Sequence, residues 1–543
     1  MLEDGKIRMA QAVDADGTPS DVACHLLLDQ ANRHGLIAGA SGTGKTVTLK
    51  VMAEGFSQAG VPVFMADVKG DVTGMAQAAD DADGKLAERA ASLGAPGWQP
   101  QGCPVRQWDM LGGEGIPVRV TVSDMGPTLL ARLLGLTEVQ EGVLNIVFRV
   151  ADEREMLLID LKDLRAMLNY VGEHAKEFQM EYGRVSSQSV GAILRALIAV
   201  EDQGGDVFFG EPALDLDDWF ACDDQGRGYV NLLNAAQLIS SPQVYAMFLL
   251  WMLSELFEEL PEVGDPDKPR FVFFFDEAHL LFDDMPKELT DRIVQVVKLI
   301  RSKGVGVYFI TQSPSDIPDE VLAQLSNRIQ HGLRAYTPAE QKAVRAAAAA
   351  FRANPAFDAE QALLEVGTGE ALVSLLNEDG QPCVVERAKV LPPECLMAAA
   401  SPDVMAAARE AAAPLMDKYG QAVDRESAYE LIAGEQAAAA EADALAAERA
   451  QLEKERAEFE AQKAAADAKA QKDYEREQAK LAKEEERARL AAEKAAQKEA
   501  ERAAREAEKQ RERAAKTVNS VIGQIGREAG RQLVRGLFGS LRR

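Results

Sequence analysis

The sequence predicts an α/β fold with a parallel sheet, a helical insertion and a long C-terminal helix. A short apolar run, Gly35–Gly39, leads into a glycine-rich loop, and helical spacing follows from Lys45. A second apolar run, Val61–Asp67, comes next. Strand, loop, helix and strand in this order form a βαβ unit, whose parallel strands need helices on both faces. The apolar run Phe271–Phe275 returns the chain to this sheet.

The charge is distributed unevenly along the chain. The net charge is −27, and hydrophobic residues make up 47% of the sequence, which is ample for a large core. Residues 434–543 hold 24 basic and 22 acidic residues, which leaves residues 1–433 with a net charge of −29. An acidic body does not bind nucleic acid or an anionic membrane by bulk attraction, so any such contact needs a local basic patch.

The cysteines and the apolar runs indicate a cytoplasmic protein. The five cysteines are widely spaced and form no C-x-x-C pair, so neither a disulfide framework nor a zinc cluster is predicted. A reducing compartment fits this pattern. The N-terminus shows no signal pattern. The apolar run Val244–Leu253 is too short to span a bilayer and predicts a buried helix instead, so we expect no transmembrane segment.

The glycine-rich loop matches the phosphate-binding pattern G-x-x-x-x-G-K-[ST] in full. Glycines let successive backbone N–H groups point at phosphates, and the following helix adds its N-terminal dipole. We expect Lys45 to reach the β- and γ-phosphate oxygens of ATP, and the Thr46 hydroxyl to ligate Mg²⁺. The residues expected to bind the nucleotide are Gly39, Ala40, Ser41, Gly42, Thr43, Gly44, Lys45 and Thr46.

An acidic pair follows the apolar run Phe271–Phe275. Ligands bind at the carboxyl edge of a parallel sheet, and Asp276 and Glu277 stand at that edge. Asp276 is predicted to hold Mg²⁺ through water, and Glu277 to polarise the attacking water. The pair and the loop together predict Mg²⁺-dependent ATP hydrolysis. ATP is preferred over GTP because the chain contains no Asn-Lys-x-Asp motif.

Two more residues are predicted to complete the reaction site. Gln312 ends a third strand, where a polar side chain either senses the γ-phosphate or simply caps the strand. Ring ATPases use an arginine from the neighbouring subunit to stabilise charge in the transition state. Arg328 is the best candidate, with Arg334 and Arg301 behind it, and an ordinary surface salt bridge is the alternative for each.

The polar stretch Asp67–Asp71 closes the second strand, near the expected position of the phosphates. Two interpretations stay open for it. Either Asp67 or Lys69 helps to shape the site, or the stretch is only a turn.

Six segments are predicted along the chain, and their compositions differ. In order, they are residues 1–128 as the first part of a P-loop ATPase core, 129–265 as a mainly helical insertion, 266–400 as the second part of the core, 401–434 as a helical linker, 435–516 as a long charged alanine-rich helix or coiled coil, and 517–543 as a basic amphipathic terminal segment.

The long helix has two interpretations. It contains no glycine or proline and is expected to reach on the order of 110 Å. Leu445, Leu452 and Phe459 keep a seven-residue spacing that permits a parallel coiled coil, whereas Ala466 and Asp473 break this apolar seam. A single solvated helix held by ion pairs four residues apart is the alternative.

The terminal segment combines apolar residues at helical spacing with arginines on another face. Arg527, Arg531 and Arg535 are four residues apart. Such a helix lies on a membrane surface, packs against a partner or contacts nucleic acid. Docking on its own protein is the simpler alternative.

Three stretches resemble the HerA-like branch of the HerA/FtsK ATPases. They read NRHGLIAGASGTGKTVTL, FFFDEAHLLF and GVGVYFITQSPSDIPDEVLAQLSNRIQHGLRA, and the resemblance covers roughly residues 25–430. Two further phrases, beginning YGRVSSQSVGAIL and NPAFDAEQALLEV, look like a bacterial subgroup of this branch. The resemblance implies a RecA-like core, ATP hydrolysis at subunit interfaces and a hexameric ring. Only 38 residues precede Gly39, which we expect to be too few for the β-barrel that HerA carries there.

Three functions stay open at this point. The leading one is a ring-forming homo-oligomer that hydrolyses ATP and translocates or remodels DNA. The second is a protein-remodelling ATPase, recruited through its long C-terminal helix and not acting on DNA. The third is a nucleotide-bound scaffold without activity, against which the intact Lys45, Asp276 and Glu277 argue.

Overall fold

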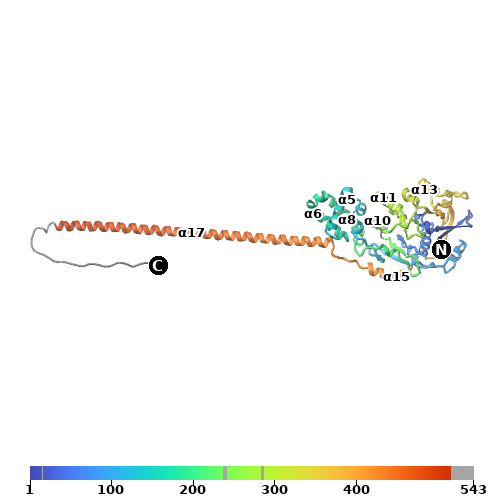
Figure 1. Ribbon diagram of the computed structural model, residues 1–543, viewed down its shortest axis with the longest axis horizontal. Coiled ribbons are helices and arrows are strands. Elements are labelled where there is room, and N and C mark those ends of the chain that lie inside the picture. Colours follow the sequence, from blue (N-terminus) through green and yellow to red (C-terminus); the bar gives the residue numbers. More distant parts are fainter. Residues whose placement is uncertain (15, 237–240, 283–286, 515–543) are drawn as a thin grey trace, which may run out of the picture. The chain divides into compact units, whose positions relative to one another are not determined.

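The computed structural model describes the chain except for residue 15 and residues 237–240, 283–286 and 515–543. Contacts between residues divide the chain into two units, Met1–Ala437 and Ala438–Arg543. The first unit holds the sheet and all of the shorter helices, which Figure 1 shows in colours from blue to orange.

A 13-stranded sheet runs through the first unit. Strand β4 lies between β10 and β11, and β10 separates β4 from β9, all in parallel. The parallel part contains, in spatial order, β11 (Asn327–His331), β4 (Gly35–Ala38), β10 (Val305–Thr311), β9 (Phe271–Phe275), β5 (Val63–Asp67), β8 (Val230–Asn234), β6 (Val105–Asp109) and β7 (Ile116–Pro117).

Both faces of the parallel strands are buried, as parallel sheets require. In β9 every residue is buried, and alternate phenylalanines pack on opposite sides. Phe274 packs with Phe56 of α1 (Lys45–Gln58) on one face. Phe273 belongs to the core on the other face, with Phe248 of α10 (Pro242–Glu259) and Val297 of α11 (Lys287–Ile300). The run Val244–Leu253 lies inside α10, so its prediction as a buried helix is confirmed.

An antiparallel extension continues the sheet beyond β11. It consists of β12 (Glu370–Ser374), β13 (Glu386–Val390), β2 (Lys6–Val13), β3 (Pro19–Leu27) and β1 (Leu2–Glu3). Strands β12 and β13 are antiparallel neighbours and form a hairpin. The apolar pattern did not predict the N-terminal strands β2 and β3, because polar residues interrupt their apolar ones.

A helical region follows β7, and Figure 1 shows α5, α6 and α8 gathered together. Its helices are α3 (Val122–Met125), α4 (Pro127–Leu133), α5 (Glu138–Glu153), α6 (Leu161–Glu173), α7 (Ala175–Tyr182), α8 (Ser187–Glu201) and α9 (Gly205–Phe208).

Two sheet strands lie where the sequence did not indicate them. Strand β8 lies after α9, within the stretch expected to be mainly helical, and β6 lies in the first part of the predicted core, where no long apolar run indicates a strand. Strand β8 contains a buried asparagine, Asn231, which interrupts the apolar run that would otherwise predict a strand. The Asn231 side chain accepts a hydrogen bond from Trp108 Nε1 at 3.0 Å and donates to the Val63 carbonyl at 3.3 Å. The neighbouring strands thus satisfy a polar group that the apolar pattern alone would exclude.

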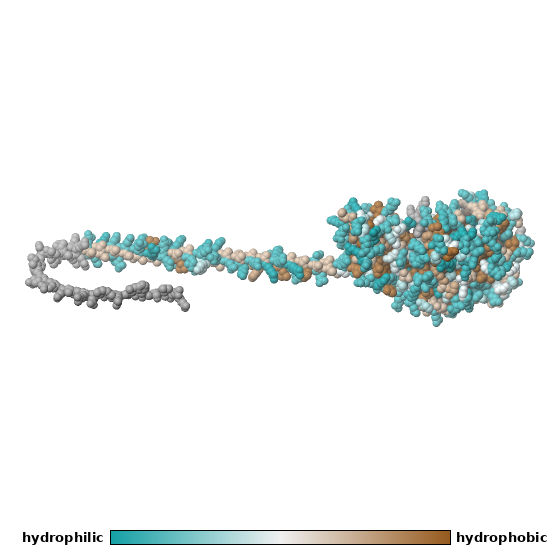
Figure 2. Space-filling view, viewed as in Figure 1, coloured by the Kyte–Doolittle hydropathy of each residue, from teal (hydrophilic) through white to brown (hydrophobic). Residues whose placement is uncertain are grey.

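Helices α15 (Pro402–Ala411) and α16 (Ala413–Tyr419) precede the long helix α17 (Ala428–Ala514). The predicted long C-terminal helix is therefore confirmed, and it begins earlier than residue 435. Its surface is mostly hydrophilic (Figure 2). The predicted basic amphipathic segment, residues 517–543, lies outside the described residues. Within the part of the chain that the structure describes, no helix is both long and apolar enough to cross a bilayer.

Candidate active site

The phosphate-binding loop joins β4 to α1 and is tied to the two strands beside β4. Gly39 N donates to the Thr311 carbonyl at 3.2 Å, and Ala40 N donates to the Gly332 carbonyl at 2.9 Å. Gly44 caps α1 with φ at +114°, a conformation that favours glycine. A Cβ on Gly39 would lie 2.5 Å from the His331 Cβ. Both glycines are therefore required by the geometry of the loop.

Lys45 lies in the first turn of α1 and turns back over the loop. Its Nζ donates to the Gly39 carbonyl at 2.7 Å and to the Ala40 carbonyl at 3.2 Å. Burial lowers the pKa of Lys45, and the nearby Glu277 carboxylate opposes this shift. The ammonium group thus lies between the loop and the acidic pair, where it can donate hydrogen bonds to phosphate oxygens.

A buried histidine, His331, lies beneath the loop, and no sequence motif indicated it. His331 Nδ1 lies 2.9 Å from the Glu370 carbonyl, and Nε2 lies 2.8 Å from Thr48 Oγ1. Because a carbonyl only accepts, Nδ1 carries the proton and Nε2 accepts from the Thr48 hydroxyl. Burial lowers the pKa of His331 to about 4, so the ring is neutral. Gly369 N also donates to the Thr43 carbonyl at 2.9 Å, which ties β12 to the loop.

Asp276 and Glu277 lie at the carboxyl end of β9, each only 7% exposed. Glu277 has φ at +49°, unusual for a residue with a side chain, and its N–H donates to Asp276 Oδ1 at 2.9 Å. Burial, aided by the neighbouring Glu277 charge, raises the pKa of Asp276 to about 6. A cation beside these two carboxylates would offset that cost.

The residues present fit Mg²⁺. Thr46 and Asp276 offer hard oxygen donors, which this ion prefers, and it is usually held by one or two carboxylates together with water and substrate phosphates. Among the described residues, no group of three or more His, Cys, Asp and Glu side chains is arranged to hold a metal ion by itself. Thr46 and Asp276 would therefore hold Mg²⁺ together with phosphate oxygens.

Three side chains surround the Glu277 carboxylate. Lys69 Nζ donates to Oε1 at 2.5 Å, and His279 Nδ1 lies 3.3 Å from Oε2. Gln312, which follows β10, also acts to lower the pKa of this carboxyl group. Burial pushes the pKa of Glu277 upward, but Lys69 and Gln312 outweigh it and hold the pKa below its usual value. Glu277 is thus an ionised carboxylate, and it interacts electrostatically with Lys45.

The stretch Asp67–Asp71 is both a turn and part of the site. Asp67 Oδ1 accepts from Gly70 N at 2.7 Å, and Oδ2 accepts from Thr73 N at 3.2 Å. This turn presents Lys69 to Glu277. The contact between Lys69 and Glu277 favours the first of the two interpretations, in which Lys69 helps to shape the site, over a turn alone.

The three arginines suggested for action in trans lie in different settings. Arg328 lies within β11, and its guanidinium donates to the Leu325 and Leu322 carbonyls at 3.0 and 2.9 Å. Burial lowers its pKa. Arg301 pairs with Asp265 at 2.9 Å. Arg334 is exposed, just beyond the strand end that contacts the loop. The structure thus brings Lys45, Asp276, Glu277 and Gln312 together and leaves the arginine assignment a prediction.

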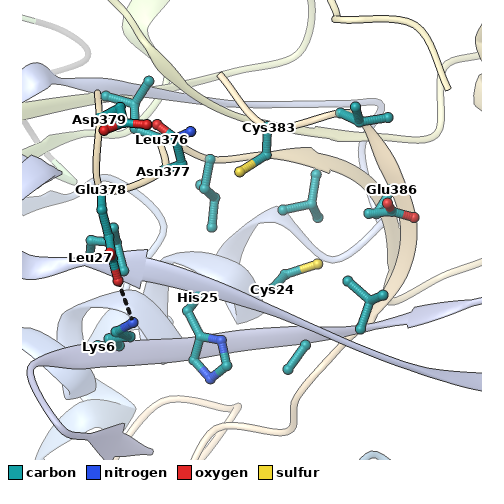
Figure 3. A pocket seen from close by; sticks show the side chains of 15 residues that line it. Lys6, Cys24, His25, Leu27, Leu376, Asn377, Glu378, Asp379, Cys383 and Glu386 are labelled. Carbon is teal, nitrogen blue, oxygen red and sulfur yellow. Dashed lines mark hydrogen bonds and ion pairs between the residues drawn. The ribbon is translucent and has the colours of Figure 1, made fainter. Parts of the chain in front are cut away.

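A separate cavity of about 500 Å³ lies between β3 and the β12–β13 hairpin (Figure 3). The Lys6–Glu378 ion pair, 3.1 Å long, lies at one end, and Glu386 lies at the other. Cys24 and Cys383 line the cavity, and all five cysteines of the chain are free. Every residue predicted for the nucleotide site lies outside this lining.

The family model described as helicase HerA-like C-terminal matches residues 14–543. The chain belongs to this family. The resemblance seen in the sequence is therefore confirmed. So is the predicted fold class of this HerA-like protein: a RecA-like P-loop core with a mostly parallel sheet, followed by a long helix.

Several solved structures resemble this HerA-like chain in part. The bacterial conjugative coupling protein TrwBΔN70 is 13% identical with a TM-score of 0.46, over 72% of this chain and 94% of its own. VirB4 of Thermoanaerobacter pseudethanolicus is 17% identical with a TM-score of 0.45, over 74% and 99%. Plasmid coupling protein TrwB in complex with ADP and Mg²⁺ is 13% identical with a TM-score of 0.46, over 72% and 95%. Among proteins with curated functions, none matches the chain.

Proposed function

We propose that this HerA-like chain hydrolyses ATP with Mg²⁺ and uses the energy to translocate or remodel DNA. The observation that carries the proposal is the meeting of Lys45 with the Asp276–Glu277 pair at the carboxyl edge of the sheet. The two parts lie far apart in the sequence, and the insertion of β10 between β4 and β9 sets the distance between them. A phosphate loop facing an ionised glutamate is the arrangement that hydrolysis needs.

Each residue has a distinct task in this proposal. The loop N–H groups and Lys45 bind the phosphates, and Thr46 and Asp276 hold Mg²⁺, which neutralises phosphate charge when bound. Glu277 accepts a hydrogen bond from the attacking water and orients it toward the γ-phosphate. Gln312 directly follows β10, the strand between β4 and β9, and in this proposal it senses the γ-phosphate.

The proposal includes a homo-oligomeric, hexameric ring, in which an arginine of one subunit completes the site of the next. Arg328 is the candidate carried over from the sequence. Its bonds to the Leu322 and Leu325 carbonyls would have to open for this role. The exposed Arg334 meets no such obstacle and is the natural comparison.

Remodelling of a protein partner is the second candidate function. The first unit is strongly acidic, and α17 is an 87-residue helix with exposed apolar residues such as Leu452 and Phe459. A helix of this kind is suited to recruit a protein. In this version the ATPase site is unchanged, and DNA has no effect on its rate.

Steady-state phosphate release by the full-length chain tests the proposal, with Lys45→Ala and Glu277→Gln as blanks. We expect Mg²⁺-dependent turnover in the wild type and none above background in either variant. Equal release by the wild type and both variants would overturn the assignment of the site. Turnover that no DNA changes would favour the protein-remodelling function.

A further inference from the structure

The ion pair between Lys69 and Glu277 joins a half-exposed lysine side chain to a buried carboxylate. The Nζ–Oε1 distance is 2.5 Å, the Lys69 side chain is 53% exposed, and that of Glu277 is 9% exposed. A half-exposed lysine can exchange partners at little cost, because such pairs contribute little net stability. Glu277 has no such freedom, since its backbone is held in the left-handed region and its carboxylate is buried.

The backbone that carries Lys69 is fixed to the nucleotide-binding helix. Lys50 of α1 is fully buried, and its Nζ donates to the Asp71 carbonyl at 2.7 Å and to the Leu396 carbonyl at 2.8 Å. Asp67 holds the other end of the same turn through Gly70 N. Only the Lys69 side chain is therefore free to move, while its origin keeps a constant position relative to the phosphate-binding loop.

Two lysines, Lys45 and Lys69, are attracted by the negative charge of the Glu277 carboxylate. Burial acts to lower the pKa of both Lys45 and Lys69, and the Glu277 carboxylate acts to raise both. The charge of Lys69 also acts to lower the pKa of Lys45. Lys45 marks the place of the β- and γ-phosphates. A γ-phosphate bears more negative charge than a carboxylate and would attract Lys69 away from Glu277. ADP brings no γ-phosphate and would leave the pair intact.

We propose that the Lys69 ammonium group holds the Glu277 carboxylate in an ion pair until ATP binds. Lys69 then leaves Glu277 and pairs with the γ-phosphate, so that the carboxylate is free to orient water only when a triphosphate is bound. This inference rests on the proposed function. A carboxylate oxygen that already accepts from an ammonium group is a weaker partner for water. Lys69 is therefore a positioning residue, which acts on hydrolysis through Glu277.

A double-mutant cycle on nucleotide affinity tests the exchange. The variants are Glu277→Gln, Lys69→Met and both together, and the probes are a non-hydrolysable ATP analogue and ADP, each with Mg²⁺. We expect Glu277→Gln to bind the analogue about three- to tenfold more tightly than the wild type, because Lys69 no longer has to leave a charged partner. ADP affinity should stay the same. In the Lys69→Met background, Glu277→Gln should tighten analogue binding less, because it then removes only the direct repulsion between the carboxylate and the γ-phosphate.

Two controls make the result specific. Lys69→Arg keeps a cation at this position and should preserve the effect of Glu277→Gln. Lys85→Met removes an exposed lysine that pairs with Asp83 away from the site, and should leave all affinities unchanged. Thermal melting of each variant confirms that it is folded.

The outcomes separate this inference from the proposed function. An equal effect of Glu277→Gln with and without Lys69, or an effect on ADP as large as that on the analogue, overturns the exchange even if the wild type hydrolyses ATP. An analogue-specific coupling between Lys69 and Glu277 supports the exchange, and it would do so even in a chain whose turnover proved negligible.

Discussion

His331 and Thr48 share a hydrogen bond of 2.8 Å beneath the phosphate-binding loop. The histidine comes from the end of β11 and the threonine from the first turns of α1, so the bond joins the sheet to the nucleotide-binding helix. Both side chains are fully buried. The loop therefore rests on a neutral polar contact that water does not reach.

Replacing Thr48 by valine should lower the free energy of unfolding by about 1–3 kcal/mol, because His331 Nε2 is left buried without its donor. Urea denaturation measures the change. His331→Leu in the same chain should make Thr48→Val less costly, since neither partner is then left unpaired. Equal costs of Thr48→Val in the two backgrounds would show that the bond does not contribute.

A second buried histidine makes stability depend on pH. His34 accepts from Val307 N at 3.0 Å and donates to the Val297 carbonyl at 2.8 Å, and burial lowers its pKa to about 4. Below the ordinary histidine pKa of about 6.5, His34 becomes protonated in the unfolded chain but stays neutral in the folded chain. The contribution of His34 is therefore complete above pH 6.5 and is lost as the pH falls toward 4.

Denaturation curves between pH 7 and 4 test this dependence. The loss of stability should be smaller for His34→Gln than for the wild type, because the glutamine does not titrate. His25→Gln, which changes a partly exposed histidine, is the matched control. An identical slope for the wild type and His34→Gln would contradict the assignment.

Glu277→Gln should reduce kcat by a factor on the order of 10²–10⁴ while nucleotide still binds, because an uncharged amide polarises the attacking water much less than a carboxylate does. Lys45→Ala should instead lose nucleotide affinity. Turnover and equilibrium binding of a fluorescent nucleotide separate the two effects. Normal turnover in Glu277→Gln would remove Glu277 from the reaction.

Arg328→Ala tests the arginine that was assigned to a neighbouring subunit. If Arg328 acts in trans, Arg328→Ala and Lys45→Ala should each be inactive alone, whereas their mixture regains part of the activity. Mixed sites then combine an intact loop with an intact arginine. Arg334→Ala is treated in parallel. Persistent turnover in Arg328→Ala, with nucleotide bound, would show that the assignment is wrong.

Local sequence was sufficient to predict some of the site and not the rest. The loop before α1 and the acidic pair after β9 depend on short spacing, and both lie at the predicted sheet edge. The Lys69–Glu277 pair joins residues that are 208 positions apart, and the His331–Thr48 bond joins residues 283 positions apart. These contacts depend on strand order, which periodicity does not encode.

The strands that escaped prediction have a common physical cause. Strand β8 contains the buried Asn231, whose amide is satisfied only by neighbouring strands and loops. The strands β2 and β3 mix polar and apolar residues because they extend the sheet with antiparallel neighbours. In each case tertiary contacts supply what the local pattern lacks.

The most direct test of the account is the steady-state ATPase rate with no DNA, single-stranded DNA and double-stranded DNA, at low and moderate salt, with Glu277→Gln as the blank. We expect Mg²⁺-dependent hydrolysis that one form of DNA stimulates, more strongly at low salt, because the contact is electrostatic. Wild-type hydrolysis at the same rate with every DNA, or no hydrolysis above the Glu277→Gln blank, would contradict the claim that the chain is a DNA-directed ATPase.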